Sequence, residues 1–295
     1  MKNELPQPTI STAGRIVFVL IYVLFVSGIF MAIATVIIGG GIDSFIHPEN
    51  LSLRDEFIIQ GASFLGTLVP VFFCRRYFDL RSISSMGFPF KGRGKDLICG
   101  LLVASVIMGL GTAILLASNE ITITGIHYDS YNFSYGFLLF VLVALNEEIL
   151  CRGYILNNLM TSMNSYLALV ISSVIFSLLH IFNSNLSWIG LLDLFVAGLL
   201  LGSTYIYTKN LWFPISFHLF WNFIQGCVLD YNVSGWNVSS VFSFNIPVKN
   251  SINGGDFGFE GSWLSIVLSM CIFLFIMYHY KSQGVSVICR KVSNP

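Results

Sequence analysis

Eight long stretches of the chain consist almost entirely of apolar residues, and polar residues separate them. The stretches are residues 15–38, 56–74, 96–117, 133–158, 165–182, 188–207, 211–230 and 262–280. A transmembrane helix needs about 20 predominantly apolar residues to cross roughly 30 Å of hydrocarbon. The stretches are continuous rather than alternating, and each exceeds the roughly 9–11 residues of a barrel strand. The pattern therefore predicts an all-α polytopic membrane protein with about eight transmembrane helices.

The composition agrees with this class. Of the 295 residues, 55% are hydrophobic and 10% are charged, whereas a soluble domain carries about 25% charged residues. The 15 Lys and Arg balance the 15 Asp and Glu, so the chain has no basic excess for binding nucleic acid. We expect membrane lipid as a partner and no nucleic acid.

The distribution of Lys and Arg predicts an orientation, because cytoplasmic loops are enriched in these residues. With the N-terminus inside, the cytoplasmic set is Lys2, Arg15, Arg75, Arg76, Arg81, Lys91, Arg93, Lys95, Lys209, Lys281, Arg290 and Lys291. The outer set is Arg54 and Lys249, and Arg152 lies within a helix. We therefore expect a multi-pass protein with both termini in the cytoplasm, located in the cell membrane if the chain is bacterial.

The chain divides into three predicted parts. Residues 1–132 hold N-terminal transmembrane helices and a basic cytoplasmic loop, and residues 231–295 hold an outer loop rich in Asn, Ser and Gly and the last helix. The ionisable residues within helices are concentrated in residues 133–230. Such residues are costly inside a membrane and are often functional. The sequence therefore predicts a catalytic or binding core at 133–230.

Two adjacent acids and a base stand near the end of the fourth apolar stretch. Glu148 and Arg152 are four residues apart, which places an acid and a base on the same helix face. Glu147 is rotated about 100° away from Glu148 and has no such local partner. We interpret Glu147 as a candidate acid–base residue and the Glu148–Arg152 pair as supporting it. A purely structural acid cluster is the alternative interpretation.

Two histidines and an asparagine on later helices extend this set of polar groups. His218 and Asn222 share a helix face, and His180 lies on the fifth apolar stretch. With Glu147 they offer the groups that activate a water molecule and stabilise an oxyanion. If a metal such as zinc binds, Glu147, His180 and His218 are its ligands, since zinc accepts carboxylate oxygen and imidazole nitrogen. No H-E-x-x-H motif is present, and these residues leave both chemistries open.

Other residues of this region predict helix packing. Gly198 and Gly202 are four residues apart on the sixth apolar stretch, a spacing that lets helix backbones approach closely. Asp193 lies on the same stretch, and we expect it to be structural.

Three motifs occur in this order along the chain: Glu147-Glu148-x-x-x-Arg152, Phe176-x-x-x-His180 and His218-x-x-x-Asn222. They resemble the three motifs of the CPBP family, also called the Abi family, which comprises type II-like CAAX prenyl proteases and bacteriocin-processing enzymes. The resemblance covers about residues 133–230. It implies an intramembrane endopeptidase, which in this family is of the glutamic or the metalloprotease type.

The resemblance also implies a role for each motif. Glu147 and His180 would activate the attacking water, His218 and Asn222 would stabilise the oxyanion, and the ion pair of the first motif would orient the site. The implied substrate is a peptide or protein in or at the membrane, such as a prenylated CAAX peptide, a bacteriocin leader or a membrane regulator.

Two functions of other classes are compatible with the same helices. A non-catalytic immunity protein would use them as a scaffold and would protect a cell even after Glu147→Ala and His180→Ala. A proton-coupled transporter would use Glu and His as a relay, but the sequence lacks the internal repeats typical of many transporters.

Overall fold

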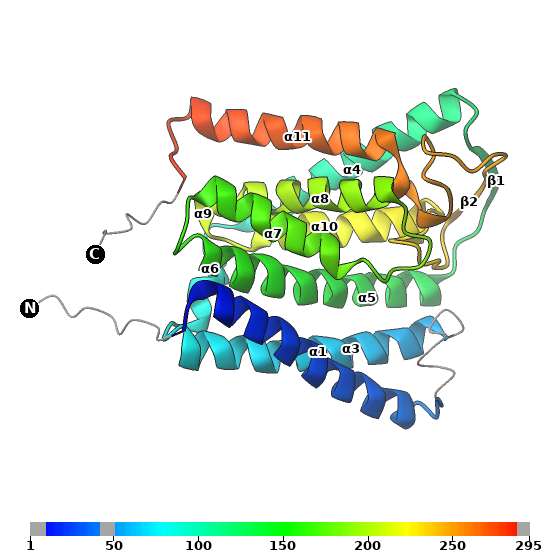
Figure 1. Ribbon diagram of the computed structural model, residues 1–295. Helices are drawn as coiled ribbons and strands as arrows, with labels where there is room; N and C mark the ends of the chain where they lie inside the picture. Colours follow the sequence, from blue (N-terminus) through cyan, green and yellow to red (C-terminus); the bar gives the residue numbers. More distant parts are fainter. Residues whose placement is uncertain (1–9, 42–50, 288–295) are drawn as a thin grey trace, which may run out of the picture.

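The computed structural model describes residues 10–41 and 51–287. Within these ranges the chain forms a bundle whose long helices run along one common axis (Figure 1). The long helices are α1 (Thr12–Ile37), α3 (Leu53–Phe73), α4 (Gly94–Ala117), α5 (Ser130–Glu148), α7 (Ser165–Leu179), α8 (Trp188–Ser203), α10 (Trp212–Phe223) and α11 (Trp263–Ser282). Each predicted apolar stretch coincides with one of them, so the predicted all-α membrane fold is confirmed.

Shorter elements extend or join these helices. Three π-helical segments continue long helices, namely η2 (Cys74–Phe78), η4 (Ile149–Leu156) and η5 (Ile224–Val228). The remaining short helices are η3 (Ile83–Met86), α6 (Asn157–Leu159), α9 (Tyr205–Thr208), η6 (Gly255–Phe257) and η7 (Phe259–Gly261). Among the residues that the structure describes, six helical segments are long and apolar enough to cross a membrane. The helices α7 and α10, with 15 and 12 residues, are shorter.

Side-chain caps fix where most of the long helices begin. The capping residues, each of which accepts a backbone N–H of the first turn, are Ser11, Ser52, Asp129, Asn164, Ser187 and Ser262. Such a side chain satisfies one of the backbone donors that the first helical turn leaves without a partner.

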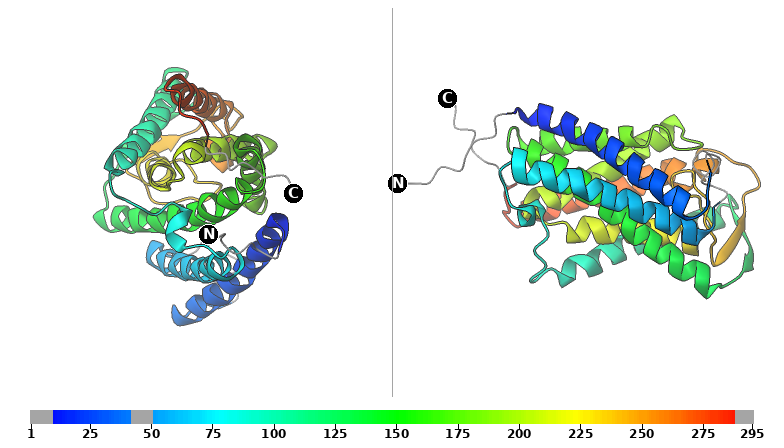
Figure 2. Two further views of the ribbon diagram at one scale, coloured as in Figure 1. Left: turned by 90° about the vertical axis from the view of Figure 1, so that its left-hand side faces the viewer. Right: turned by 90° about the horizontal axis from the view of Figure 1, so that it is seen from below.

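The centre of the bundle is α10, which contacts α4, α5 and α8. The end-on view in Figure 2 shows α10 surrounded by the other helices, while α1 and α3 form a pair at one side. This pair reaches the rest of the bundle through the packing of α3 on α5, and α7 and α11 both pack on α8. The polar residues of α10 are therefore enclosed by protein rather than exposed on the outer surface.

A two-stranded antiparallel sheet lies at the end of the bundle opposite the termini (Figure 1). It pairs β1 (Thr122–Ile126) with β2 (Phe242–Asn245), and the register shifts between Ile123 and Gly125. We call this end the strand end and the opposite one the terminal end. The sheet ties the α4–α5 connection to the loop 231–261, which folds over the strand end.

Close packing of α8 on α7 depends on the two glycines that the sequence singled out. A Cβ atom on Gly198 would lie 2.9 Å from the backbone Cα of Ser173, and one on Gly202 would lie 2.4 Å from the side chain of Leu169. The predicted role of this spacing in helix packing is thereby confirmed.

Replacing Gly198 with valine should lower the free energy of unfolding by about 1–3 kcal/mol, the usual cost of overpacking. The obstacle at Gly198 is backbone, which cannot rotate away as a side chain can. Thermal unfolding of the detergent-purified protein measures the change. The control is Gly109→Val on α4, where a Cβ meets nothing within 4 Å. Equal unfolding temperatures for the two variants would contradict the expectation.

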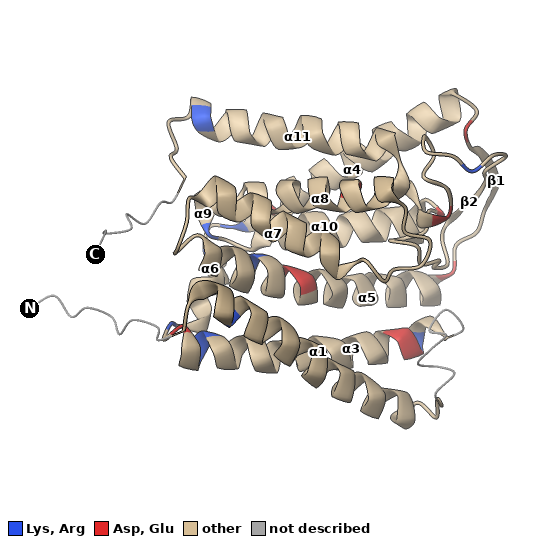
Figure 3. Ribbon diagram, in the orientation of Figure 1, with Lys and Arg blue, Asp and Glu red and all other residues tan. Residues whose placement is uncertain are grey.

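Lys and Arg gather at the terminal end of the bundle, as Figure 3 shows. Lys249 lies in the loop 231–261. Three members of the predicted cytoplasmic set, Lys2, Arg290 and Lys291, lie outside the described residues. The charge asymmetry therefore follows the long axis of the bundle.

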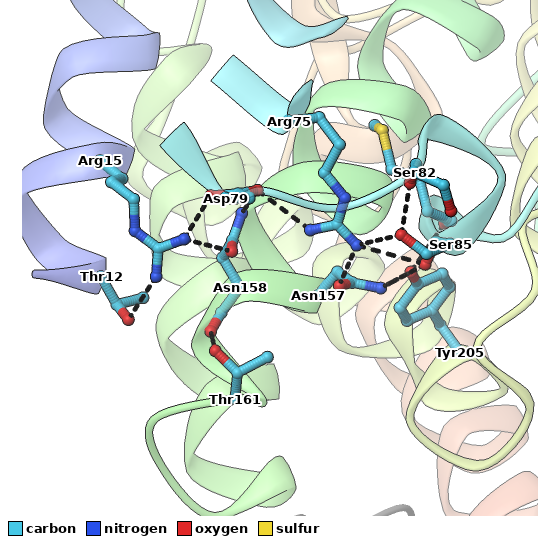
Figure 4. A network of polar contacts seen from close by, with 11 residues as sticks. Thr12, Arg15, Arg75, Asp79, Ser82, Ser85, Asn157, Asn158, Thr161 and Tyr205 are labelled. Carbon is cyan, nitrogen blue, oxygen red and sulfur yellow. Dashed lines mark hydrogen bonds and ion pairs between the residues drawn. The ribbon is translucent and has the colours of Figure 1, made fainter. Parts of the chain in front are cut away.

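Two arginines of this set are buried around one aspartate (Figure 4). Asp79 pairs with Arg15 from α1 and, at 3.0 Å, with Arg75 from η2. It also accepts a hydrogen bond of 2.9 Å from Asn158 on α6. The network joins the α1–α3 pair to the segment that follows α5.

Arg75 reaches further into the core. Its Nη2 donates to Ser85 Oγ at 2.7 Å and to Asn157 Oδ1 at 2.9 Å. The Asn157 amide donates in turn to the Tyr205 hydroxyl at 2.7 Å. Because buried polar groups need partners, this network fixes how the terminal ends of several helices meet.

Candidate active site

A cavity of about 430 Å³ lies between α5, α7, α8, α10 and the loop 231–261. Its walls are largely apolar and include Leu139, Phe140, Val143, Phe176, Leu194 and Phe217. Four polar residues predicted from sequence line it as well, namely Glu147, His180, His218 and Asn222. The fold thus brings residues from three helical segments to one apolar cavity.

Glu147 is the carboxylate that faces the two imidazoles. Its Oε2 lies 3.5 Å from His180 Nε2 and 3.9 Å from His218 Nε2. This oxygen is buried and has no hydrogen-bond partner among the described residues. A buried oxygen without a hydrogen-bond partner is costly. Glu147 Oε2 is therefore positioned to accept a hydrogen bond from a group that enters the cavity.

His180 stands directly after the last residue of α7, as its C-cap. Its Nδ1 lies 2.8 Å from the carbonyl oxygen of Phe176. A carbonyl only accepts, so Nδ1 must carry the hydrogen of this bond. The other ring nitrogen, Nε2, is therefore directed at Glu147 with its lone pair available.

Glu148 holds His218 through the ring nitrogen Nδ1. Its Nδ1 donates to Glu148 Oε1 at 2.8 Å, and the same oxygen accepts from Arg152 Nη1 at 2.7 Å. Glu148 and Arg152 are buried, with 0% and 1% of their surfaces exposed. The predicted Glu148–Arg152 pair is present, and it orients His218 so that Nε2 points toward Glu147.

Arg152 is itself packed on three sides. Its Nη2 donates to the carbonyl oxygen of Gly198 at 3.3 Å, and its guanidinium carbon lies 4.3 Å from the centre of the Phe176 ring. A guanidinium over an aromatic face is favourable. Phe176 therefore contacts two residues of the site. Its ring packs against Arg152, and its carbonyl oxygen orients His180.

Asn222 lies one turn beyond His218 on α10, as the four-residue spacing predicts. Its side chain is 4% exposed and lines the cavity beside His218. The amide offers two N–H donors. His218 and Asn222 thus form a polar edge on an otherwise apolar helix.

The π-helical segment η4 begins directly after Glu148, which no sequence pattern had indicated. Such wide turns are frequent at functional sites. All eight residues of η4 are buried, including Arg152. The acid and base of the first motif nevertheless remain on one face, because both kinds of helix bring residues four apart close together.

Several lining residues were missed by the sequence analysis. Gln60 on α3 and Asn146 on α5 add amides to the cavity, and Trp221 on α10 and Glu260 on η7 add an indole and a second carboxylate. Gln60 and Glu260 lie in parts of the chain outside 133–230, the region in which function was expected. Nothing in their local sequence distinguishes them from other polar residues near helix ends.

The Glu147 carboxylate and the two imidazoles that face it are ligand types that zinc accepts. As placed, however, no group of three His, Cys, Asp or Glu within residues 10–41 and 51–287 could hold a metal ion. Each Nε2 instead has its lone pair or proton directed at the Glu147 carboxylate.

The cavity opens beside the end of α7. Phe182 is 96% exposed and Leu179 is 40% exposed, yet both line the cavity. Because α7 is short, its last residues lie at mid-length of the bundle (Figure 1).

Comparison with known proteins assigns a family to the segment that holds the site. Residues 129–224 match the family model of type II CAAX prenyl endopeptidases, Rce1-like. No curated protein matches the chain, and no solved structure matches it. The matched residues include the three sequence motifs, and they exclude α1, α3, α4 and the loop 231–261.

Proposed function

Because residues 129–224 match the Rce1-like model of type II CAAX prenyl endopeptidases, we propose that the chain is a membrane protease of this kind and that it hydrolyses a peptide bond with a water molecule activated by Glu147 and His180. The observation that supports this most is the approach of Glu147 Oε2 to both imidazole Nε2 atoms inside an apolar cavity. A protease site needs a base, a proton partner and an oxyanion site. Glu147, His180, and His218 with Asn222 are of residue types suited to these three roles.

In the first step, the water molecule binds between Glu147 Oε2 and His180 Nε2. Two atoms 3.5 Å apart are close enough for one water to hydrogen-bond both. The carboxylate takes a proton as the water oxygen forms a bond to the carbonyl carbon, and the carbonyl π electrons move to its oxygen. When this tetrahedral species collapses, the C–N bond breaks and the proton passes to the leaving amine.

His218 and Asn222 stabilise the oxyanion that forms in this step. The Asn222 amide donates an N–H, and His218 donates from Nε2 when that nitrogen is protonated. Glu148 supports the protonated ring, because its carboxylate accepts from Nδ1 at 2.8 Å. Removing one such donor from an oxyanion site costs about 10²–10³ in kcat in a well-studied protease.

The substrate that fits this cavity is a membrane-associated peptide with an apolar segment. The walls contain aromatic and aliphatic side chains, and the opening beside α7 includes Phe182 and Leu179. Such a surface suits a prenylated or otherwise apolar peptide. We further propose that the terminal end is cytoplasmic, because Lys and Arg gather there.

Cleavage should be seen directly when the detergent-purified protein is incubated with a pool of isoprenylated CAAX and leader-type peptides. Mass spectrometry identifies the bond, and incorporation of one ¹⁸O atom from labelled water identifies hydrolysis. His180→Gln should lower kcat by about 10²–10³, since general acid–base groups contribute that much. The matched control is His279→Gln, an exposed histidine on α11, which should leave kcat unchanged.

Parallel reactions with and without a chelator test directly whether cleavage needs a metal ion. In the mechanism proposed here, cleavage persists in the presence of chelator. Loss of cleavage that zinc restores would make Glu147, His180 and His218 metal ligands and would contradict their role as acid and base. Equal kcat for the wild-type protein and His180→Gln would contradict the mechanism altogether.

A further inference from the structure

A second carboxylate, besides that of Glu147, lines the cavity from outside the matched family segment. Glu260 lies on η7, is 6% exposed, and belongs to the loop 231–261. It takes no part in the mechanism described above, and it forms no ion pair with a described basic residue. A buried charge that persists without a counter-ion needs strong hydrogen bonds, so its contacts indicate its role.

Both oxygens of Glu260 accept hydrogen bonds, and the donors come from two different walls of the cavity. Oε1 accepts from Trp221 Nε1 on α10 at 2.7 Å. Oε2 accepts from Ser234 twice, from its backbone N–H at 2.9 Å and from its hydroxyl at 2.6 Å. Hydrogen bonds to an ionised acceptor are about twice as strong as neutral ones. Glu260 therefore joins α10 to the segment around Ser234.

That segment is a tight turn, residues 233–236, closed by a bridge between Val233 and Trp236. Ser234 and Gly235 both have positive φ values, of 50° and 87°. Positive φ is costly for a residue other than glycine, so the surrounding contacts must hold Ser234 in this conformation. The two hydrogen bonds from Ser234 to Glu260 supply them.

The turn also fits closely against the connection between α7 and α8. A Cβ atom on Gly235 would lie 1.9 Å from the carbonyl oxygen of Ser184, and the Gly235 N–H donates to the carbonyl oxygen of Phe257 at 3.0 Å. All four residues of the turn line the cavity. The turn is thus a wall on the strand-end side, while the exposed Phe182 marks the opening.

We propose that Glu260 is a positioning residue that pins the turn 233–236 as the end wall of the cavity, and that this wall limits how far a bound peptide extends toward the strand end. The proposal rests on the proposed function, because it assigns a specificity determinant to the same cavity. Trp221 lies between His218 and Asn222 on α10. Glu260 therefore holds the wall at a fixed place relative to both of these residues.

The test compares Glu260→Gln with Asp256→Asn. Both changes replace an acid of the same loop by its amide, but the Asp256 side chain is 54% exposed and pairs with Lys249. In Glu260→Gln the side chain has one acceptor oxygen instead of two, so it cannot accept from Trp221 and from Ser234 on opposite sides at once. The link between α10 and the turn is therefore broken while the side-chain size is kept. A peptide that the wild-type protein cleaves is lengthened one residue at a time, at each end separately.

For the wild-type protein and Asp256→Asn, kcat/KM should fall sharply beyond a certain length at one end of the peptide. For Glu260→Gln, the ratio of kcat/KM for long to short peptides should rise at least about fivefold. KM for the short peptide should rise while kcat changes less, because Glu147 and His180 are untouched. A uniform fall in kcat with an unchanged length ratio would show a merely structural role and overturn the proposal.

Hydrogen exchange of the Ser234 amide, followed by mass spectrometry, tests the pin without any cleavage. Exchange should be faster in Glu260→Gln than in the wild-type protein and in Asp256→Asn. Equal exchange in all three proteins would overturn the proposal. If the wild-type protein cleaves no peptide, the proposed function fails, whereas the exchange result still decides whether Glu260 pins the turn.

Discussion

Cleavage by the Glu147→Gln protein should be lower by about 10⁴ or more in kcat, with the protein still folded. The amide keeps the size of the side chain but cannot take a proton from water. Groups that act as a unit lose nearly the whole of their joint effect when one is removed. The measurement is single-substrate kinetics with the best peptide from the pool, together with thermal unfolding of the same preparation.

The matched control for Glu147→Gln is Glu56→Gln. Glu56 on α3 is 7% exposed, and its Oε2, like that of Glu147, is buried and has no hydrogen-bond partner among the described residues. It does not line the cavity, so its replacement should leave kcat within about twofold. Retained cleavage in Glu147→Gln, or equal losses in both variants, would rule out Glu147 as the base.

Replacing Arg152 with methionine should lower the free energy of unfolding by about 3–5 kcal/mol, because it leaves the Glu148 carboxylate buried without its partner. Glu148 has one oxygen shared by Arg152 and His218 and a second oxygen with no partner among the described residues. Few sites in the chain depend as strongly on a single counter-ion. Thermal or denaturant unfolding in detergent measures the change.

Two further variants separate charge from packing at this site. Glu148→Gln combined with Arg152→Met should recover most of the stability, because a buried ion pair replaced as a whole often costs little. It should not recover cleavage, since His218 loses its carboxylate partner. Arg93→Met, which breaks an exposed pair with Asp96, should cost less than about 1 kcal/mol. If the double variant lost as much free energy of unfolding as Glu148→Gln and Arg152→Met lose together as single variants, this explanation would be wrong.

The helices and the polar spacings within them were predictable, because each depends on a short range of sequence. The pair Glu148–Arg152 and the shared face of His218 and Asn222 follow from helical periodicity alone. The catalytic roles of these residues stay predictions until the variants are assayed. Their meeting at one cavity was implied only by the resemblance of the three motifs, since periodicity carries no information on how helices pack.

The features that sequence reasoning missed depend on contacts between distant segments. Arg15 and Arg75 were counted as cytoplasmic charges, but both are buried around Asp79. The Glu260 carboxylate accepts a hydrogen bond from Trp221, 39 residues away along the chain, and the Asn-, Ser- and Gly-rich composition of its loop gave no sign of this contact. Pairings of this kind are set by tertiary packing, which composition and periodicity do not encode.

Asp79 emerges from the ribosome 79 residues before Asn158, one of its hydrogen-bond donors. At about 5–20 residues per second, that interval lasts roughly 4–16 s. During it, Arg15 and Arg75 can already pair with Asp79, while the partners that α6 supplies have not yet been synthesised. The ion pairs of Asp79 with Arg15 and Arg75 therefore need only the N-terminal pair of helices and η2, whereas its contact with Asn158 needs the segment that carries the site.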